Sequence, residues 1–350
     1  MAAIPEASLN SMKQVAIREA WLDLLQEDIL EPSLPIVDPH HHIWDHNGER
    51  YLLEELMRDT GTGHNIRSTV FVQCASKYDM DAIPERRSLG ETRFITSIAV
   101  ASEADKSTPT LACAGIIGMV DLTLGERVTP LLEEHVAISG GRFVGVRNRT
   151  AWNPSPEVRS NLESPPPGPL AHPAFHDGAR QLGKLGLTLD VWAYHPQMAQ
   201  VLDVARAAPG LTLVVNHCGG PLGTGPYAGR RAEVFTEWRA SMVALAACPN
   251  VVVKIGGLTM EVTGFDFHHK KLPPSSQTLA EAWKPYVETC IELFGAERCM
   301  FESNFPVDKG MCSYPVLWNA FKRLAAGASE AEKTALFSGT AARVYRLPPV

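Results

Sequence analysis

The alternation of short apolar runs with amphipathic stretches constrains the fold of this chain more than any other feature. Most of the runs are apolar without strict alternation, which is typical of strands covered on both faces. Eight runs have this character: 34–43, 68–74, 115–122, 142–149, 187–195, 211–218, 251–256 and 298–305. Amphipathic stretches separate many of them: 127–138, 175–185, 196–208, 232–247 and 279–294. Eight such units predict the α/β class and a (β/α)8 TIM barrel.

Three segments fall outside this alternation. Residues 1–33 form an N-terminal extension in which we expect one helix, over 12–27. Residues 150–172, rich in Pro, Asn and Ser, form a long loop after the fourth strand, and residues 264–278 form another after the seventh. We therefore predict a single catalytic barrel domain over 34–350. Loops that follow barrel strands build active sites, so both long loops are expected to wall the substrate.

Composition narrows the class of protein. A chain of 350 residues, 45% hydrophobic and 20% charged, is large enough for one such barrel. A formal net charge of −7 argues against a nucleic-acid partner, and no apolar stretch is long enough for a membrane span. The seven cysteines include no Cys-x-x-Cys pair, and the N-terminus lacks a secretory pattern. These features predict a cytoplasmic protein with reduced thiols; whether it forms a homo-oligomer is left open.

The octapeptide at residues 38–45, Asp-Pro-His-His-His-Ile-Trp-Asp, closes the first apolar run. Side chains alternate across a strand, so His40 and His42 share a face while His41 points away. Two imidazoles on one face can both reach one divalent cation. Asp38 could hydrogen-bond to a metal-ligating side chain and so fix its orientation. The alternative is a surface cluster of histidines without a role.

Titratable and polar residues also follow the other apolar runs, where a parallel barrel places its reactive groups. They are Gln73, Arg147, Tyr194, His195, His217, Glu302 and Asn304. Arg147 is a candidate for binding a substrate carboxylate, with a structural ion pair as the alternative. On the fifth strand, either Asp190, Trp192 and Tyr194 or Val191, Ala193 and His195 face inward. Trp152 and Tyr194 could hold a flat ring or simply anchor their loop.

Four motifs resemble those of the amidohydrolase superfamily, in its family 2 branch, which includes sugar-acid and pyrone-dicarboxylate lactonases and some aromatic-acid decarboxylases. The first is the octapeptide 38–45, and the second is Arg-Phe-Val-Gly-Val-Arg at 142–147. The third is Val-Asn-His-Cys-Gly-Gly-Pro at 215–221, and the fourth is Met-Phe-Glu-Ser-Asn-Phe-Pro-Val-Asp at 300–308. The resemblance covers roughly residues 34 to 348 and implies a barrel enzyme acting on a small molecule.

The resemblance also implies a metal site and reveals a departure from it. Members that bind metal use two histidines of strand one, a histidine of strand five and an aspartate of strand eight. These positions correspond to His40, His42, His195 and Asn304, so an amide stands where the family carries its general base. Three neutral ligands with an open position suit Zn²⁺ and a bound water. Action without a metal is the alternative, with the histidines polarising the substrate carbonyl directly.

These observations predict a hydrolase that opens a lactone, or cleaves a related ester or amide, of a small carboxylated or aromatic substrate. His40, His42 and His195 would hold the metal, and Arg147, Tyr194, Gln73 and Trp152 would bind substrate. His217 would activate water or protonate the leaving oxygen, with Glu302 and Asn304 as further catalytic candidates. One alternative is a non-oxidative decarboxylase of an aromatic or muconate-type acid. Another is a barrel that binds its ligand without catalysis.

Overall fold

A computed structural model describes residues 14–46, 49–160 and 165–348 of the chain. Eight parallel strands form one sheet in the order β1-β4-β5-β6-β7-β8-β9-β10. A bridge between His41 and Phe305 joins the first strand to the segment after the last and closes the barrel. The strands are β1 (Pro35–His41), β4 (Asn65–Val72), β5 (Leu111–Gly118), β6 (Phe143–Arg149), β7 (Thr188–Trp192), β8 (Leu213–Val215), β9 (Val251–Ile255) and β10 (Cys299–Phe301). The expected TIM barrel is confirmed.

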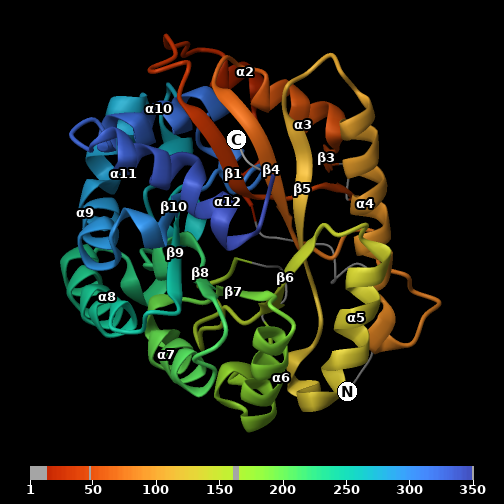
Figure 1. Cartoon of the computed structure of the whole chain (residues 1–350). Coiled ribbons are helices and arrows are strands. Elements are labelled where there is room, and N and C mark those ends of the chain that lie inside the picture. Colours follow the sequence, from red (N-terminus) through yellow and green to blue (C-terminus); the bar gives the residue numbers. More distant parts are fainter. Residues whose placement is uncertain (1–13, 47–48, 161–164, 349–350) are drawn as a thin grey trace.

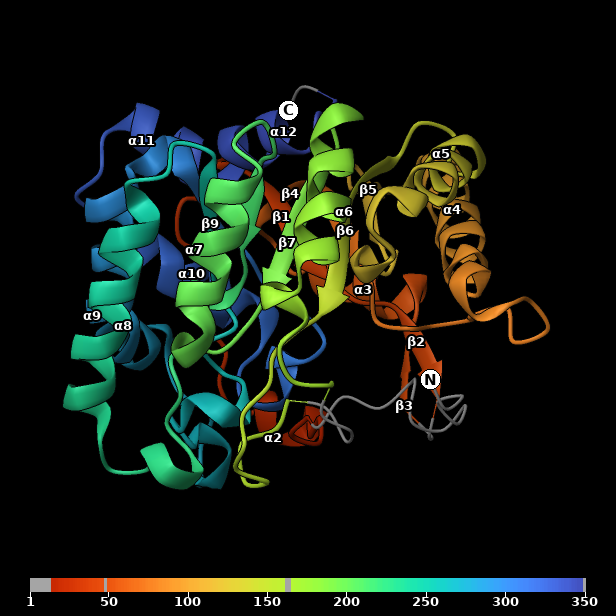
Figure 2. The ribbon, with the colours of Figure 1, turned by 90° about the horizontal axis from the view of Figure 1, so that it is seen from below.

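Helices surround the strands, as Figure 1 shows. The main ones are α3 (Leu53–Thr60), α4 (Ser88–Ala104), α5 (Thr129–Ile138), α6 (Pro173–Lys184), α7 (Met198–Ala207), α8 (Arg231–Ala246), α9 (Ser276–Phe294), α10 (Tyr314–Leu324), α11 (Glu330–Thr334) and α12 (Thr340–Val344). Figure 2 shows short α2 (Glu19–Leu22) and the hairpin of β2 (Trp44–His46) and β3 (Glu49–Tyr51) at one end of the barrel, and α12 at the other. No helix in the described ranges is long and apolar enough to cross a membrane.

The N-terminal helix is much shorter than predicted. Residues 12 and 13 lie outside the described part, and residues 14–18 are not helical, so only Glu19–Leu22 forms α2. Hydrogen bonds to the barrel fix this segment instead of helical hydrogen bonds. The Trp21 side chain donates to the Lys270 carbonyl, and the Arg18 side chain donates to the His268 carbonyl. Helix α4 was not predicted, because its Thr, Ile and Val residues weaken the helical pattern.

The side-chain alternation of each strand separates two cores. The larger core lies between strands and helices, and includes Leu189, Val191, Leu213 and Val215. The smaller core fills the barrel with Val37, Val70, Val72, Ile117, Val144, Val214, Val252 and Met300, closed by Ala341, Tyr345 and Leu347 from the C-terminal segment. Residues two positions beyond Val252 and Met300 share their inward face. Lys254 and Glu302 therefore enter the barrel above this apolar layer.

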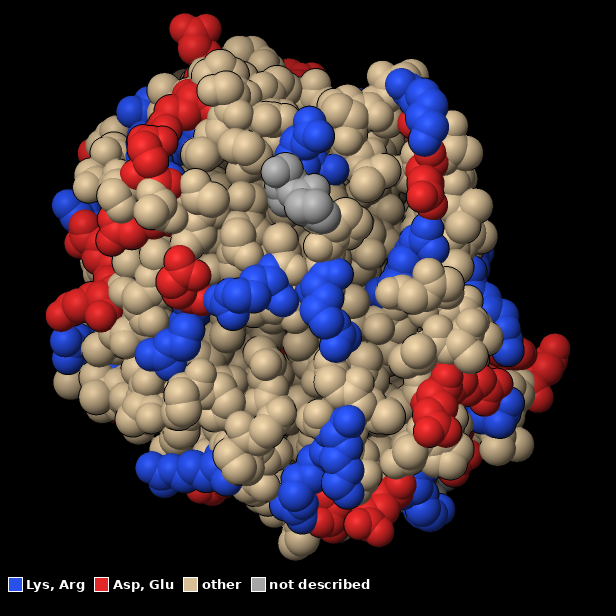
Figure 3. Space-filling view, viewed as in Figure 1, with Lys and Arg blue, Asp and Glu red and all other residues tan. Residues whose placement is uncertain are grey.

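Figure 3 shows both acidic and basic side chains on one face of the molecule, with most of the acidic ones towards its edges. The expectation of no nucleic-acid partner rests on net charge and stays a prediction.

Candidate active site at the carboxyl ends of the strands

Three histidines from two strands meet at one end of the barrel. The ring centroids of His40 and His42 lie 5.0 Å apart, and those of His40 and His217 lie 4.6 Å apart. All three side chains are buried. His41, between the two β1 histidines, points the other way and contacts the hydroxyl of Thr69. The sequence pattern therefore placed these imidazoles on the correct faces.

Glu302 bridges two of these histidines. Its Oε1 lies 2.7 Å from Nδ1 of His217 and also accepts the backbone N–H of that residue at 3.1 Å. Its Oε2 lies 2.7 Å from Nδ1 of His40. A carboxylate beside Nδ1 favours a proton on that nitrogen, which leaves the lone pair on Nε2. Because Oε1 accepts both N–H groups of His217, Glu302 orients the His217 ring with Nε2 as the basic atom.

His42 is held in the same tautomer by a different group. Its Nδ1 donates to the carbonyl of Val72 at 2.8 Å, and its buried Nε2 has no hydrogen-bond partner among the described residues. A buried polar atom without a partner is costly, so this nitrogen is available to a ligand.

Burial sets the protonation states. It lowers the pKa of His40, His42 and His217 well below the ordinary value, and the nearby Lys254 and Arg147 lower those of His40 and His217 further. Burial also raises the pKa of Glu302 to about 8, although Lys254 acts in the opposite direction. The imidazoles are therefore neutral at neutral pH and can accept a proton.

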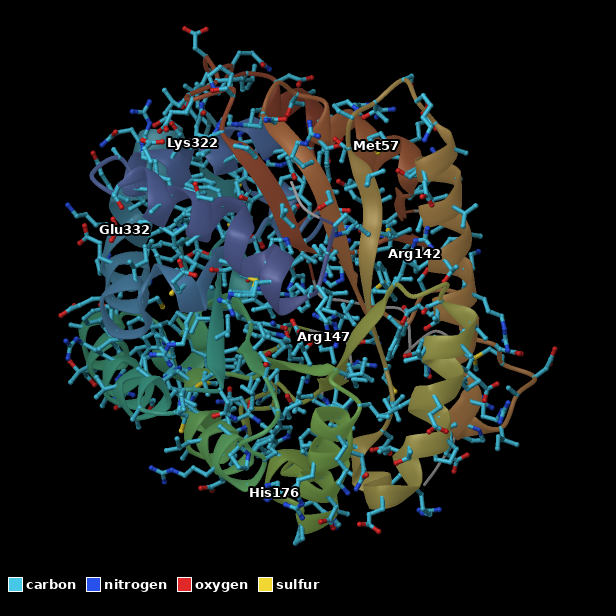
Figure 4. The ribbon with its side chains drawn as sticks, viewed as in Figure 1. Met57, Arg142, Arg147, His176, Lys322 and Glu332 are labelled. Atoms are coloured by element: carbon cyan, nitrogen blue, oxygen red, sulfur yellow. The ribbon has the colours of Figure 1, made fainter. Side chains whose placement is uncertain are left out.

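Arg147 lies in the middle of the barrel, as Figure 4 shows, whereas Lys322 and Glu332 lie at the periphery. Its Nη1 donates to Nε2 of His40 at 3.4 Å, and its Nη2 donates to the carbonyl of Gln73. Burial lowers the pKa of this guanidinium. Its position beside the histidine cluster is compatible with the predicted anion-binding role.

Sequence reasoning missed a buried ion pair beneath the cluster. Nζ of Lys254 on β9 lies 2.7 Å from Oδ2 of Asp190 on β7, and both side chains are fully buried. The same Nζ lies 3.5 Å from Nδ1 of His40. A lone lysine in the run Val-Val-Val-Lys-Ile was a usable signal, because buried lysines are rare unless they are paired. Asp190 belonged to one of the two alternative faces proposed for the fifth strand.

The fifth strand presents that face, with Asp190 and Trp192 inward. The Trp192 ring lies 4.7 Å from that of His217. His195 follows the strand in a 3₁₀ turn (His195–Gln197) and is not brought into the cluster. Its Nδ1 accepts the N–H of Leu222, and its Nε2 lies 3.8 Å from the exposed Glu237 of α8.

Asn304 occupies a left-handed turn, with φ of 55°, directly after β10. Its backbone N–H donates to the carbonyl of His40, and its amide donates to Asp308 Oδ1 at 2.8 Å. Burial raises the pKa of Asp308 to about 7. Through its backbone N–H and its side-chain amide, Asn304 thus links β1 to the loop after β10.

The remaining substrate-binding candidates lie around the barrel end. Gln73 donates to the Tyr78 hydroxyl, and its buried Oε1 has no hydrogen-bond partner in the part of the chain that the structure describes. The Tyr194 hydroxyl bonds the backbone N–H and Oγ of Ser160, which anchors the loop after β6. Trp152 is half-buried in the same loop, where its backbone N–H donates to Oε1 of Gln197. For Tyr194 this geometry favours the loop-anchoring alternative.

Two glycines after β9 make room for the catalytic candidates. A Cβ on Gly256 would lie 2.4 Å from Cγ of Glu302, and one on Gly257 would lie 2.4 Å from Nδ1 of His217. Gly257 also has a φ of +64°, which side chains rarely adopt. The turn after β9 therefore needs glycine both for its backbone and for its neighbours.

The cluster contains the donors of a metal site. Within the described ranges, His40, His217 and Glu302 each offer a ligand atom, and these atoms lie within 4.8 Å of one another. These donors are, however, in contact with each other at 2.7 Å. Neighbouring ligands of a tetrahedral zinc with bonds of about 2.1 Å lie about 3.4 Å apart. A ring Nδ1–H that contacts a carboxylate still leaves Nε2 free for a metal, so these contacts do not exclude one. Arg147 and Lys254, however, place two cations beside His40, which favours the metal-free alternative.

Comparisons with known proteins agree with the fold. An uncharacterised protein, y4mH, of Sinorhizobium fredii is 30% identical over 90% of this chain and 99% of the relative. An L-fucono-1,5-lactonase of Burkholderia multivorans is 26% identical over 89% of this chain and 96% of the relative. A crystal structure of an amidohydrolase from Burkholderia multivorans with bound HEPES superposes with a TM-score of 0.67, at 25% identity over 89% and 99% of the two chains.

Another crystal form of the Burkholderia multivorans amidohydrolase contains zinc and superposes with a TM-score of 0.66, at 24% identity over 89% and 99% of the two chains. The family model described as amidohydrolase matches residues 37–347, which include every strand of the barrel except the first residues of β1. The chain therefore belongs to the amidohydrolase family and is an enzyme of the hydrolase type.

Proposed function

We propose that the protein is a lactonase that opens the ring of a small sugar-acid or carboxylated lactone without a resident metal ion. The observation that carries this proposal is the 2.7 Å contact between Glu302 and Nδ1 of His217. A neutral imidazole oriented by a carboxylate is a general base for water. Lactonases among the relatives support the choice of a cyclic ester as substrate.

The proposed reaction uses residues at one end of the barrel. Nε2 of His217 removes a proton from water as the water oxygen attacks the lactone carbonyl. The unpartnered Nε2 of His42 offers a second site for a polar group of the substrate. The buried guanidinium of Arg147 stabilises negative charge as the carbonyl oxygen becomes an oxyanion. The proton held by His217 then passes to the ring oxygen as the carbon–oxygen bond breaks.

The test is a panel of lactone-opening assays on purified protein, with L-fucono-, L-rhamnono- and pyrone-type lactones. We expect turnover on at least one of them, unchanged after dialysis against a chelator and with no stoichiometric metal by elemental analysis. Loss of turnover on chelation and its recovery with Zn²⁺ would contradict the metal-free proposal. Release of carbon dioxide from aromatic acids, without lactone hydrolysis, would identify a decarboxylase instead.

The variant that tests the base is His217→Ala. Loss of a general base lowers kcat by roughly 10²- to 10⁴-fold. His135→Gln is a matched control, because His135 is also buried but bonds Thr92 and Ser88 among the outer helices. Equal activity of His217→Ala and the wild type would contradict the assignment.

A further inference from the structure

The most unusual group outside the proposed reaction is the ammonium of Lys254. It lies inside the barrel, fully buried, directly above the apolar layer that contains Val252. A buried charge persists only when partners compensate for its lost hydration. The groups that surround the Lys254 ammonium therefore indicate its role.

The carboxylate of Asp190 and the ring of Tyr345 fix the position of the Lys254 ammonium. Asp190 Oδ2 lies 2.7 Å from Nζ. Asp190 in turn accepts hydrogen bonds from Asn216 Nδ2 at 2.8 Å and from the Tyr345 hydroxyl at 3.0 and 3.1 Å. The Tyr345 ring also lies 5.0 Å from Nζ, within the range of a cation–π contact. The ammonium therefore has a fixed position that does not depend on substrate.

The upper side of Lys254 faces the proposed catalytic residues. Its Nζ lies 3.5 Å from Nδ1 of His40, the nitrogen that contacts Glu302. We propose that Lys254 is a positioning residue, a buried cation that favours the ionised form of Glu302 and so its hydrogen bond with His217, in the electrostatic place that a metal ion takes in other hydrolases. The inference rests on the proposed lactonase function and deepens it.

Variants can separate this role from structural support. Lys254→Met removes the charge but leaves Asp190 buried and unpaired, so that variant alone is expected to lose stability. The double variant Asp190→Asn/Lys254→Met removes both charges and should regain most of the stability. We expect kcat of the double variant to stay at least about 10²-fold below wild type, with KM changed less than about threefold. Recovery of activity together with stability would show that the pair is only structural.

A matched control is Lys322→Met. Lys322 is also buried, with its Nζ bonded to the carbonyls of Leu30 and Glu31 and to His64, but it lies at the periphery of the barrel in Figure 4. We expect this variant to lose stability and keep kcat once folded. An equal loss of kcat in the folded Lys322→Met variant would overturn the inference.

A measurement independent of turnover distinguishes failure of the inference from failure of the proposed function. ¹⁵N-histidine NMR reports which ring nitrogen carries the proton. In the wild type at neutral pH we expect His217 as the Nδ1–H tautomer, and in the double variant a shift towards Nε2–H. Identical histidine spectra would overturn the role of Lys254, even if the wild type opens lactones. A wild type without lactonase activity, but with the expected spectral change, would refute only the proposed function.

Discussion

At the scale of single residues, burial determines the pH at which the site can work. The pKa of His217 lies well below its ordinary value because the ring is buried beside Arg147 and Lys254. A general base must be neutral, so a lowered pKa extends its working range to more acidic pH. Protonation of His217 itself is therefore expected to lower kcat/KM only below about pH 6.5, the ordinary value for histidine. Protonation of Glu302, whose pKa burial raises to about 8, is expected to give a separate decline near that value, which Glu302→Gln should remove. pH–rate profiles of both proteins check this, and a decline between the two values that persists in Glu302→Gln would contradict it.

A second residue-scale prediction concerns Glu91 of α4, which accepts the backbone N–H groups of Cys74 and Ser76 just after β4. Burial raises the pKa of this carboxyl to about 7, above its unfolded value of 4.5. The folded state then binds more protons between these values, so the contribution of Glu91 to stability falls as pH rises through this window.

Glu91→Gln removes this titration and keeps an acceptor oxygen. We expect the free energy of unfolding of the variant, minus that of the wild type, to increase between pH 5 and pH 8. The increase is about 1.4 kcal/mol for each unit of pKa shift. Urea denaturation at both pH values measures the difference. A difference that is independent of pH would show that Glu91 titrates normally.

At the scale of elements, the ends of the strands determine the site. Gly257, in the turn after β9, has a positive φ and lies against His217. Gly257→Ala is expected to displace the imidazole and lower kcat by at least about tenfold, in addition to a backbone cost of roughly 1 kcal/mol. Gly229→Ala is the control, because Gly229 has a φ of +73° and no heavy atom within 4 Å of the added Cβ. Enzyme kinetics and thermal denaturation of both variants separate strain from displacement.

The elements also show what sequence could and could not predict. All eight strands were expected, because runs such as 213–215 are apolar on both faces and bounded by turns. The residues at which the strands end were not predicted exactly, and the position of His195 depends on such an end. The fifth strand stops at Trp192, and the chain turns before His195, which then points towards α8. The pairing of Lys254 with Asp190 joins two strands that are distant in the sequence, so local pattern alone did not reveal it.

At the scale of the whole molecule, the N-terminal segment packs over the end of the barrel that holds the site. Trp21 is buried and donates to the carbonyl of Lys270 in the loop after β9. Glu19 pairs with Lys309, in the loop after β10. The extension thus connects two loops that flank the histidine cluster.

Trp21→Ala tests this connection. Removing a buried tryptophan side chain is expected to cost about 3–5 kcal/mol of stability. We also expect KM to rise more than kcat falls, because the loops lose support while Glu302 and His217 keep their contacts. Trp21→Phe, which keeps most of the ring but not the N–H, should retain most of the stability. A rise in kcat for Trp21→Ala would instead indicate that the segment obstructs substrate entry.

The position of Tyr345 has a consequence for biosynthesis. The hydroxyl that bonds Asp190 belongs to a residue that leaves the ribosome after all eight strands. A nascent chain lacking it has an open barrel floor and an aspartate with one partner fewer. Hydrolytic competence is therefore acquired only after residue 345 has been synthesised, and a bulky fusion inserted just before this residue should abolish it even when the barrel strands have formed.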